Sequence, residues 1–350
     1  MRGARAGTDR VYLGVDGGGT KTALCLLDGG GRVVAEAETV GTYSTEDPVG
    51  VVSRVLDDAV EALCAPSGIA EGGVEHAFVG LPGYGEMSWA VPGLDAAARR
   101  ALGRWAGERV TCGNDMVCAW AGSLGLADGV NVIAGTGSMA YGERGAARAR
   151  AGGWGELFGD EGSAHWVGVR GLSLFSRMSD GRAPVGPLHD HLRQHLGITQ
   201  DLDAVDVVLN RWAGDRARVA GLSRVVAAAA QDGDAGAAEV LDDAADHLVA
   251  LVDAVRRPLG FDGEEVLRVS RSGGVFRAAA VRDAFDARVA ALGRVELRRP
   301  LHPPVLGAAL QAARLAGSPL DEGARARLAG RPGGRVRGGD GAPAGAQGEV

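Results

Sequence analysis

The chain has 350 residues, of which 46% are hydrophobic and 23% charged, a composition typical of a folded globular protein. This excludes a disordered or collagen-like chain, and the formal net charge of −7 argues against nucleic acid as a partner. No apolar run approaches the ~18 residues of a membrane-spanning helix, and the basic N-terminus lacks the cleavage site of a signal peptide. We therefore expect a cytoplasmic protein without a membrane partner.

The first part of the chain alternates apolar strands with glycine turns and helical periodicities. The first three predicted strands are joined by turns too short for a parallel return, so we expect them to be antiparallel. In chain order the predicted elements are strands at 11–16, 23–28 and 32–39, a helix at 48–64, a strand at 76–83, a helix at 94–106 and a strand at 108–113.

At residue 130 this layout starts again. The sequence VNVIAGTGS at 130–138 repeats the arrangement of VYLGVDGGGTKT at 11–22, an apolar strand that ends in a Gly/Thr/Ser turn. A strand at 139–144 follows, and the chain is then mainly helical to about residue 257. The later predicted elements are a strand with a glycine turn at 266–276 and a helix at 303–317.

The repeated opening predicts an α/β fold built from two domains that are related by internal duplication. We place an N-terminal domain at 11–122, joined by the helix at 303–317, and a C-terminal domain with a helical insertion at 123–302. Residues 1–10 are expected to be a flexible N-terminus. Residues 318–350 are expected to be a disordered tail, because Gly, Ala, Arg and Pro dominate there without apolar periodicity.

The strongest single motif is DGGGTKT at 16–22, between the first two strands. Three consecutive glycines let backbone N–H groups approach an anion closely, and the Thr20 hydroxyl and the Lys21 amine add donors. The spacing differs from a GxxxxGK[ST] loop, and an ordinary hairpin turn needs only one or two glycines. A carboxylate beside such a loop suits Mg²⁺ reached partly through water, which makes Asp16 the candidate ligand. The motif predicts a phosphate cradle made of Gly17, Gly18, Gly19, Thr20 and Lys21.

A second glycine turn, Gly135–Ser138, has the same design. Such turns are common in glycine-rich chains. Paired with the first motif, this turn predicts that Thr136 and Gly137 bind phosphate and that the two loops enclose a triphosphate in a cleft between the domains. Gly273 and Gly274 follow a later strand and precede a helix. Two interpretations stay open there: a flat surface for adenine, or a strand-to-helix connection without a ligand.

Asn114 and Asp115 stand where a strand ends and a helix begins. An acidic residue at such a junction is most often a helix cap, and the residues alone favour that interpretation. The alternative is a general base that deprotonates a substrate hydroxyl as it attacks the γ-phosphorus of ATP.

The segment GGWGELFGDEGSAHW at 152–166 combines an aromatic ring with carboxylates between glycines. Trp154 could cover the apolar face of a sugar ring while Asp160 accepts hydrogen bonds from its hydroxyls. Asp160 could instead cap the helix that follows, and His165 on that helix is more often structural. Glu86, in the loop after an earlier strand, could point into the cleft or away from it.

Seven motifs follow one another along the chain: DGGGTKT, GLPGYGE, NDMVCAWAGSLG, AGTGS, GGWGELFGDEGSA, SGGVF and PPVLGAAL. Their order resembles the N-acetylglucosamine kinase branch of the BadF/BadG/BcrA/BcrD ATPase family, within the actin-like ATPase and sugar kinase superfamily, over most of residues 11–317. The resemblance implies two actin-like, ribonuclease H-like domains with a cleft, and it implies ATP and Mg²⁺ as cofactors. It also implies phosphorylation of an amino sugar, above all N-acetylglucosamine, at its 6-hydroxyl. A homodimer is expected as well.

The resemblance assigns roles residue by residue. Asp115 matches the family's catalytic base, which reverses the preference for a cap. Thr20 and Thr136 match the two phosphate loops. The other assigned residues are Gly273 and Gly274 for the nucleotide turn, and Gly153, Trp154 and Asp160, with Ser44 and Asn114, for the sugar.

Two departures from the family pattern concern the sugar. Asn is common after the third strand, where this chain reads GTYST at 41–45, and again after the second glycine turn, where it has Met139. Methionine offers an acetamide neither a strong donor nor a strong acceptor. We therefore expect weak discrimination between N-acetylated and free amino sugars.

Three other functions compete with this interpretation. A kinase for another hexosamine would carry the same motifs. An ATP-driven electron-transfer activator of a reductase or dehydratase needs accessible thiolates for an iron–sulfur cluster between two subunits, whereas Cys112 and Cys118 flank the proposed base. A sensor that binds sugar or nucleotide without turnover is disfavoured by Asp115.

Overall fold

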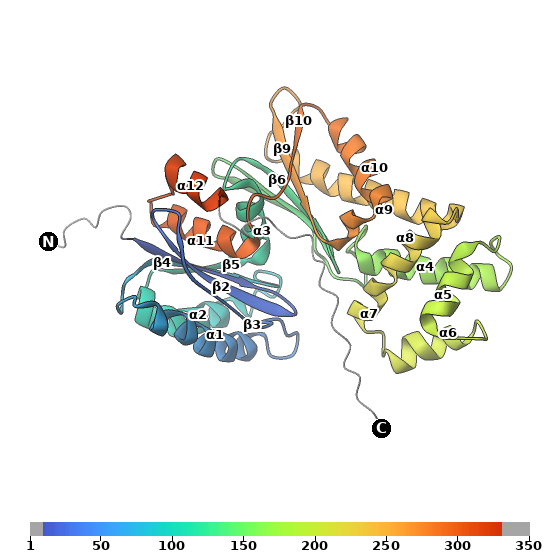
Figure 1. Ribbon diagram of the computed structural model, residues 1–350, viewed down its shortest axis with the longest axis horizontal. Coiled ribbons are helices and arrows are strands. Elements are labelled where there is room, and N and C mark those ends of the chain that lie inside the picture. The colour runs from blue at the N-terminus through green and yellow to red at the C-terminus, as the bar shows by residue number, and fades with distance from the viewer. Residues whose placement is uncertain (1–9, 331–350) are drawn as a thin grey trace. The chain divides into compact units, whose positions relative to one another are not determined.

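The computed structural model describes residues 10–330. Within them the chain divides into two compact units, each of which carries a five-stranded sheet with helices on it (Figure 1). Unit 1 contains the residues up to Leu126 and those from Pro300 onward, and unit 2 contains Ala127–Arg299. The helix α3 (Asp115–Leu124) continues past residue 122, where the sequence suggested a boundary.

The sheet of unit 1 has the strand order β3-β2-β1-β4-β5. The first three strands form antiparallel hairpins, as predicted, β4 pairs in parallel with the central strand β1, and β5 pairs in parallel with β4. Gly17 pairs with Thr22, so the first glycine motif forms the tip of the β1–β2 hairpin. The strands are β1 (Val11–Gly17), β2 (Lys21–Asp28), β3 (Val33–Val40), β4 (Val74–Leu81) and β5 (Val110–Asn114).

Alternate residues of β1 serve two separate cores, because successive side chains of a strand point to opposite faces. Leu13 and Val15 pack with α1 (Pro48–Cys64) and α2 (Val91–Ala106) on one face. Tyr12 packs with the helix α11 (Pro304–Leu315) and with α3 on the other. A short 3₁₀ turn at Ala65–Ser67 follows α1.

Two glycines allow α11 to lie directly on its neighbours in unit 1. A Cβ on Gly14 of β1 would overlap the backbone of Ala309, and a Cβ on Gly307 would overlap the carbonyl of Cys118 in α3. Real Cβ atoms do not approach backbone this closely, so a larger residue at either position would push the helix away. The last long helix of the chain is therefore an integral layer of unit 1.

The expected disorder after residue 317 is wrong for part of that segment. Residues Glu322–Ala329 form the helix α12, whose N-cap Asp321 accepts a hydrogen bond from the Ala324 amide at 2.7 Å. Ala324 and Leu328 are buried, and two apolar residues are too few to produce a visible periodicity. Residues 1–9 and 331–350, for which flexibility and disorder were also expected, lie outside the described residues.

The sheet of unit 2 repeats the topology of unit 1, with the order β10-β9-β6-β7-β8. Its first strand again forms an antiparallel hairpin, a third strand extends that hairpin, and two later strands join in parallel. The predicted α/β fold with internal duplication is confirmed. The strands are β6 (Gly129–Ala134), β7 (Ser138–Arg144), β8 (Ala147–Gly152), β9 (Leu267–Ser272) and β10 (Val295–Arg298).

Helices make up most of the remainder of unit 2. The longest, α9, packs across β6, β7 and β8, and its buried N-cap Asp234 also accepts a hydrogen bond from the Leu188 amide of α5 at 2.8 Å. Among residues 10–330, no helix combines the length and the apolarity that crossing a bilayer requires. The helices are α4 (Ala164–Ser179), α5 (Pro187–Leu196), α6 (Asp203–Val205), the π-helix η3 (Asp206–Arg211), α7 (Arg216–Gly221), α8 (Ser223–Gln231), α9 (Ala235–Arg256), the 3₁₀ turn η4 (Gly274–Arg277) and α10 (Ala279–Ala290).

Candidate functional site

The first glycine loop, Gly17–Lys21, is held from one side and open on the other. The Thr42 amide, just after β3, donates a hydrogen bond to the Gly18 carbonyl at 3.0 Å, and a Cβ on Gly41 would overlap the Gly19 carbonyl. A Cβ on Gly19 itself would meet no atom within 4 Å. The loop is therefore fixed by the segment after β3 and still leaves its tip accessible, as a phosphate cradle requires.

Two carboxylates of unit 1 influence each other beside this loop. Asp16 is the penultimate residue of β1, and Asp115 is the first residue of α3. Burial and the negative charge of Asp115 raise the pKa of Asp16 to about 8, and Lys21 acts in the opposite direction. A side chain on Gly80 would crowd the Asp115 backbone, at 3.2 Å from its Cα, so the glycine lets α3 begin beside β4.

This pair of carboxylates fits a hard divalent cation. Oxygen ligands suit Mg²⁺, which keeps several waters and often binds through one or two carboxylates together with phosphate oxygens. Across residues 10–330, no group of three or more His, Cys, Asp or Glu side chains is arranged to hold a metal. Water and substrate oxygens would therefore have to complete the coordination at Asp16.

The cap of α3 is Asn114 and not Asp115. The Asn114 Oδ1 atom accepts a hydrogen bond from the Met116 amide at 3.1 Å, and its Nδ2 donates to the Tyr84 carbonyl at 3.3 Å. Interpreting Asp115 as the helix cap is thus wrong, because the preceding residue performs that function. Asn114, predicted to contact the sugar, has protein partners for both of its side-chain groups.

Of three other predicted residues of unit 1, two are exposed and Ser44 is half-buried. The Lys21 ammonium is exposed and pairs with Glu38 at 2.6 Å. Thr20 is exposed at the hairpin tip. The Ser44 hydroxyl accepts a hydrogen bond from the Asp47 amide at 3.0 Å and so shapes the turn before α1.

The second glycine loop, Gly135–Ser138, is anchored to the segment that precedes α4. The Ala164 amide donates to the Gly135 carbonyl at 2.9 Å, and the Ser138 hydroxyl donates to the Glu161 carbonyl at 2.6 Å. Thr136 is exposed at the tip. A Cβ on Gly137 would lie 2.8 Å from a carboxylate oxygen of Asp160, so this loop and that carboxylate touch.

Asp160 is only 3% exposed and has a left-handed φ of 58°, which is unusual for a residue other than glycine. Its Oδ2 accepts a hydrogen bond from Nη2 of Arg216 at 2.5 Å, and its Oδ1 accepts one from the Ser138 amide at 3.5 Å. Burial raises the pKa of Asp160, and the guanidinium of Arg216 opposes that rise. The cap of α4 is Ser163, whose hydroxyl accepts from the Trp166 amide at 3.1 Å, so the alternative of Asp160 as a cap is wrong.

The other predicted residues of unit 2 lie on neighbouring loops. Trp154 is 68% exposed, and the Gly153 amide before it donates to the Ser138 carbonyl at 2.9 Å. A Cβ on Gly153 would overlap the Met139 side chain, which packs directly against it. Gly273 has a φ of 104° and lies against the Ala134 backbone, where any side chain would overlap. A Cβ on Gly274 would meet open space.

Some residues of these loops were not found from the sequence. Gly41 and Thr42 hold the first loop, but in the sequence they stand out only as part of a segment that departs from the family pattern. Arg216 touches the second loop from a helix that is 56 residues away from Asp160. No local pattern marks such a contact, because the two residues meet only through the tertiary fold.

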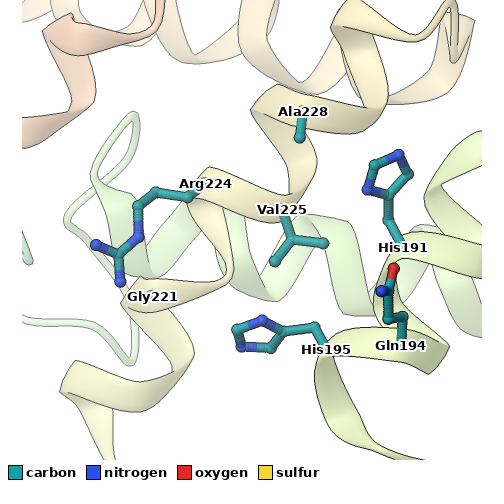
Figure 2. Close-up of a pocket in the computed structure, with 7 residues that line it drawn as sticks. All are labelled: His191, Gln194, His195, Gly221, Arg224, Val225 and Ala228. Atoms are coloured by element: carbon teal, nitrogen blue, oxygen red, sulfur yellow. The ribbon is translucent and has the colours of Figure 1, made fainter. Parts of the chain in front are cut away.

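A cavity of about 420 Å³ lies elsewhere in unit 2, between α5 and the segment from α7 to α8 (Figure 2). Figure 2 shows His191, Gln194 and His195 on one side, with the guanidinium of Arg224 extending toward Gly221 on the other. None of the predicted site residues lines it, so it is not the candidate site. Its lining residues are His191, Gln194, His195, Gly221, Arg224, Val225 and Ala228.

The duplicated sheet topology is that of actin-like ATPases and sugar kinases. The model of the BadF/BadG/BcrA/BcrD ATPase family matches residues 13–312, and the chain belongs to this family.

Individual relatives share about a quarter of the sequence. The N-acetylmuramic acid/N-acetylglucosamine kinase of Clostridium acetobutylicum is 27% identical over 267 residues, which cover 76% of this chain and 85% of the relative. The N-acetyl-D-glucosamine kinase of Dictyostelium discoideum is 26% identical over 315 residues, covering 86% and 97%. A solved structure from Chromobacterium violaceum, provisionally named an N-acetylglucosamine kinase, is 26% identical with a TM-score of 0.68, covering 88% of this chain and 99% of that one.

Proposed function

We propose that the chain is an ATP-dependent kinase that phosphorylates the 6-hydroxyl of an amino sugar, most of all N-acetylglucosamine. The observation that most strongly supports this proposal is the arrangement of side chains at the start of α3. Asn114 satisfies the helix N-terminus, and Asp115 interacts electrostatically with Asp16 at the end of β1. A carboxylate that is not needed as the cap and that stands beside a glycine loop suits a general base in phosphoryl transfer.

Asp115 would take the proton of the sugar 6-hydroxyl as that oxygen attacks the γ-phosphorus and the bond to the β-phosphate oxygen breaks. The backbone N–H groups of the first glycine loop would bind phosphate oxygens, and the exposed Thr20 and Lys21 add donors. Asp16 would hold Mg²⁺, in part through water, and when bound this ion would offset phosphate charge. Thr136 and Gly137 would serve the phosphates in the same way as the first loop.

The remaining residues of unit 2 would bind the sugar and the base of ATP. Asp160 has unused lone pairs that can accept hydrogen bonds from sugar hydroxyls, and the exposed ring of Trp154 can cover the apolar face of a sugar. Gly153 supports that loop. Gly273 and Gly274 would give adenine a surface without side chains. Ser44 and Asn114 are the proposed sugar contacts from unit 1.

An electron-transfer activator is a weaker candidate. Its iron–sulfur cluster would need thiolates that reach a subunit interface. Cys25, Cys64 and Cys118 are buried, and Cys112 is half-buried. Burial raises the pKa of both Cys112 and Cys118, which disfavours the thiolate form.

An ADP-release assay tests the proposal with glucosamine, N-acetylglucosamine, N-acetylmuramic acid, N-acetylmannosamine and glucose. We expect sugar-dependent ADP release with an N-acetylated hexosamine, and ³¹P NMR should locate the product phosphate at O6. Met139 packs against Gly153, at a position where an amide side chain could have formed hydrogen bonds with the acetamide of the sugar. The ratio of kcat/KM for N-acetylglucosamine to that for glucosamine should therefore stay below about 10⁴.

Asp115→Asn serves as the control, since it should remove the sugar-dependent rate. ADP release that no sugar stimulates would overturn the proposal. Omitting Mg²⁺ tests the metal assignment in the same assay. Sedimentation tests the expected homodimer, and cell fractionation tests the expected cytoplasmic location.

A further inference from the structure

One arginine of unit 2 contacts both Asp160, the residue proposed to bind the sugar, and the second glycine loop. Arg216 is the first residue of α7, and its Nη2 donates to Asp160 Oδ2 at 2.5 Å. Its Nε lies 3.2 Å from an oxygen of Glu156. A Cβ on Gly137 would lie 2.7 Å from the same Nη2. A single guanidinium therefore joins α7, the loop before α4 and the second glycine loop.

Arg216 stabilises the charged form of Asp160. Its carboxylate is almost completely buried, and removal from water disfavours an ionised carboxylate. Among the groups that face it, Arg216 and the Ser138 amide stabilise the charged form, whereas Glu156 opposes it. His165 of α4 also faces this cluster, and burial lowers its pKa, so it adds little positive charge near neutral pH.

We propose that Arg216 is a positioning residue for sugar binding. It holds the Asp160 carboxylate ionised and fixed against Gly137, so that this sugar-binding carboxylate and the phosphate loop keep one geometry. This inference rests on the proposed kinase function. Arg216 acts through Asp160 and not on the reacting atoms. Its planar guanidinium donates to Asp160 from Nη2 and places Nε within ion-pair distance of Glu156, a geometry that the single ammonium of lysine cannot reproduce.

The kinetic test compares Arg216→Ala, Arg216→Lys and Arg218→Ala. Arg218 lies on the same helix with an exposed side chain and serves as the matched control. We expect Arg216→Ala to raise the sugar KM at least about tenfold, with a smaller change in kcat, because the ionised form of its buried partner loses its main support. Arg216→Lys should recover part of the loss, and Arg218→Ala should match the unmodified chain.

The pH profile separates this role from a merely structural one. If Asp160 must be ionised to bind sugar, removing Arg216 raises its pKa, and kcat/KM for the sugar then begins to fall at a higher pH as the solution is acidified. In a background of Asp160→Asn, Arg216→Ala should change the sugar KM little, because the group through which it acts is already neutral.

The proposal is overturned if Arg216→Ala leaves both the sugar KM and the acid limb of the pH profile unchanged. It is also overturned if the effects of Arg216→Ala and Asp160→Asn on the sugar KM multiply as independent factors in the double variant. If Arg216→Ala does not fold, Arg216→Lys carries the same comparisons, and an unshifted acid limb with an unchanged KM in that variant overturns the proposal. A chain that phosphorylates no sugar at all contradicts the proposed function instead, so the two failures are distinguishable.

Discussion

Each unit has a glycine loop at the end of its central strand, but the charged side chains beside the two loops are balanced in different ways. In unit 1, the glycine loop follows Asp16, whose pKa is raised by burial and by the negative charge of Asp115, while Lys21 acts in the opposite direction. In unit 2, the glycine loop lies against Asp160, which is already paired with Arg216. Under the proposed function, a divalent cation would complete the first arrangement and a neutral sugar the second. Duplication thus preserved the backbone and let the side chains diverge.

Among the substitutions that test this comparison, Asp115→Asn should have the largest effect. We expect kcat to fall by about 10²–10⁴-fold, because loss of a general base costs that much, while sugar binding persists. Asn114 still caps α3 in this variant, so the chain should stay folded. Steady-state kinetics, sugar calorimetry and thermal unfolding check the three parts. Normal turnover would remove Asp115 from the mechanism.

Asp160→Ala disturbs unit 2 in the matching position. The sugar KM should rise at least about tenfold, since losing a hydrogen-bonding partner of a buried polar group costs roughly 1–3 kcal/mol or more. The affinity for ATP should hardly change, and titration of each substrate separately measures the difference. Asp160→Asn, which keeps shape and some hydrogen bonding, provides the milder control. Equal losses for sugar and ATP would contradict the assignment.

The support of the first glycine loop can be tested with two alanine substitutions. Gly41→Ala should lower the free energy of unfolding by about 1–3 kcal/mol and weaken ATP binding, because its Cβ would overlap the Gly19 carbonyl. Gly19→Ala places its Cβ in open space, so its stability should change by no more than about 0.5 kcal/mol. Urea unfolding measures both, and equal effects would show that the segment after β3 does not hold the loop.

The smallest effect is expected for Lys21→Ala. Its ammonium is exposed and paired with Glu38, and exposed ion pairs are worth only about 0.2–1 kcal/mol, so the KM for ATP should rise less than about fivefold. The difference should shrink as salt is added, because salt screens exposed charges. Complete loss of activity with normal ATP binding would instead place Lys21 in the chemical step.

The fold was predictable from the sequence to the extent that local signals mark it. Turns that are too short for a crossover predicted the hairpins of the first sheet, and the repeat near residue 130 predicted the duplication. The strands β8 and β10 were missed because both are short edge strands with charged residues, β8 reading ARARAG and β10 reading VELR. The helix α12 was missed because only two of its residues are buried.

The side-chain arrangement was less predictable than the fold. Adjacent candidates such as Asn114 and Asp115 compete for one capping position, and the sequence alone favoured the wrong residue. The partner of Asp160 lies on a helix distant in sequence, in the part for which only general helicity was predicted. Contacts of this kind depend on how helices pack, which periodicity does not specify.

The packing of α11 has a consequence for biosynthesis. Unit 2 is continuous in sequence, so all of its residues leave the ribosome before α11 does. Until then the face of β1 that carries Tyr12 lacks the helix that covers it in the finished protein. Because long-range pairing of this kind is slow, unit 2 should complete its fold before unit 1, which has to wait until α11 has emerged. A nascent chain that stalls before Pro304 would therefore expose apolar surface to chaperones and proteases.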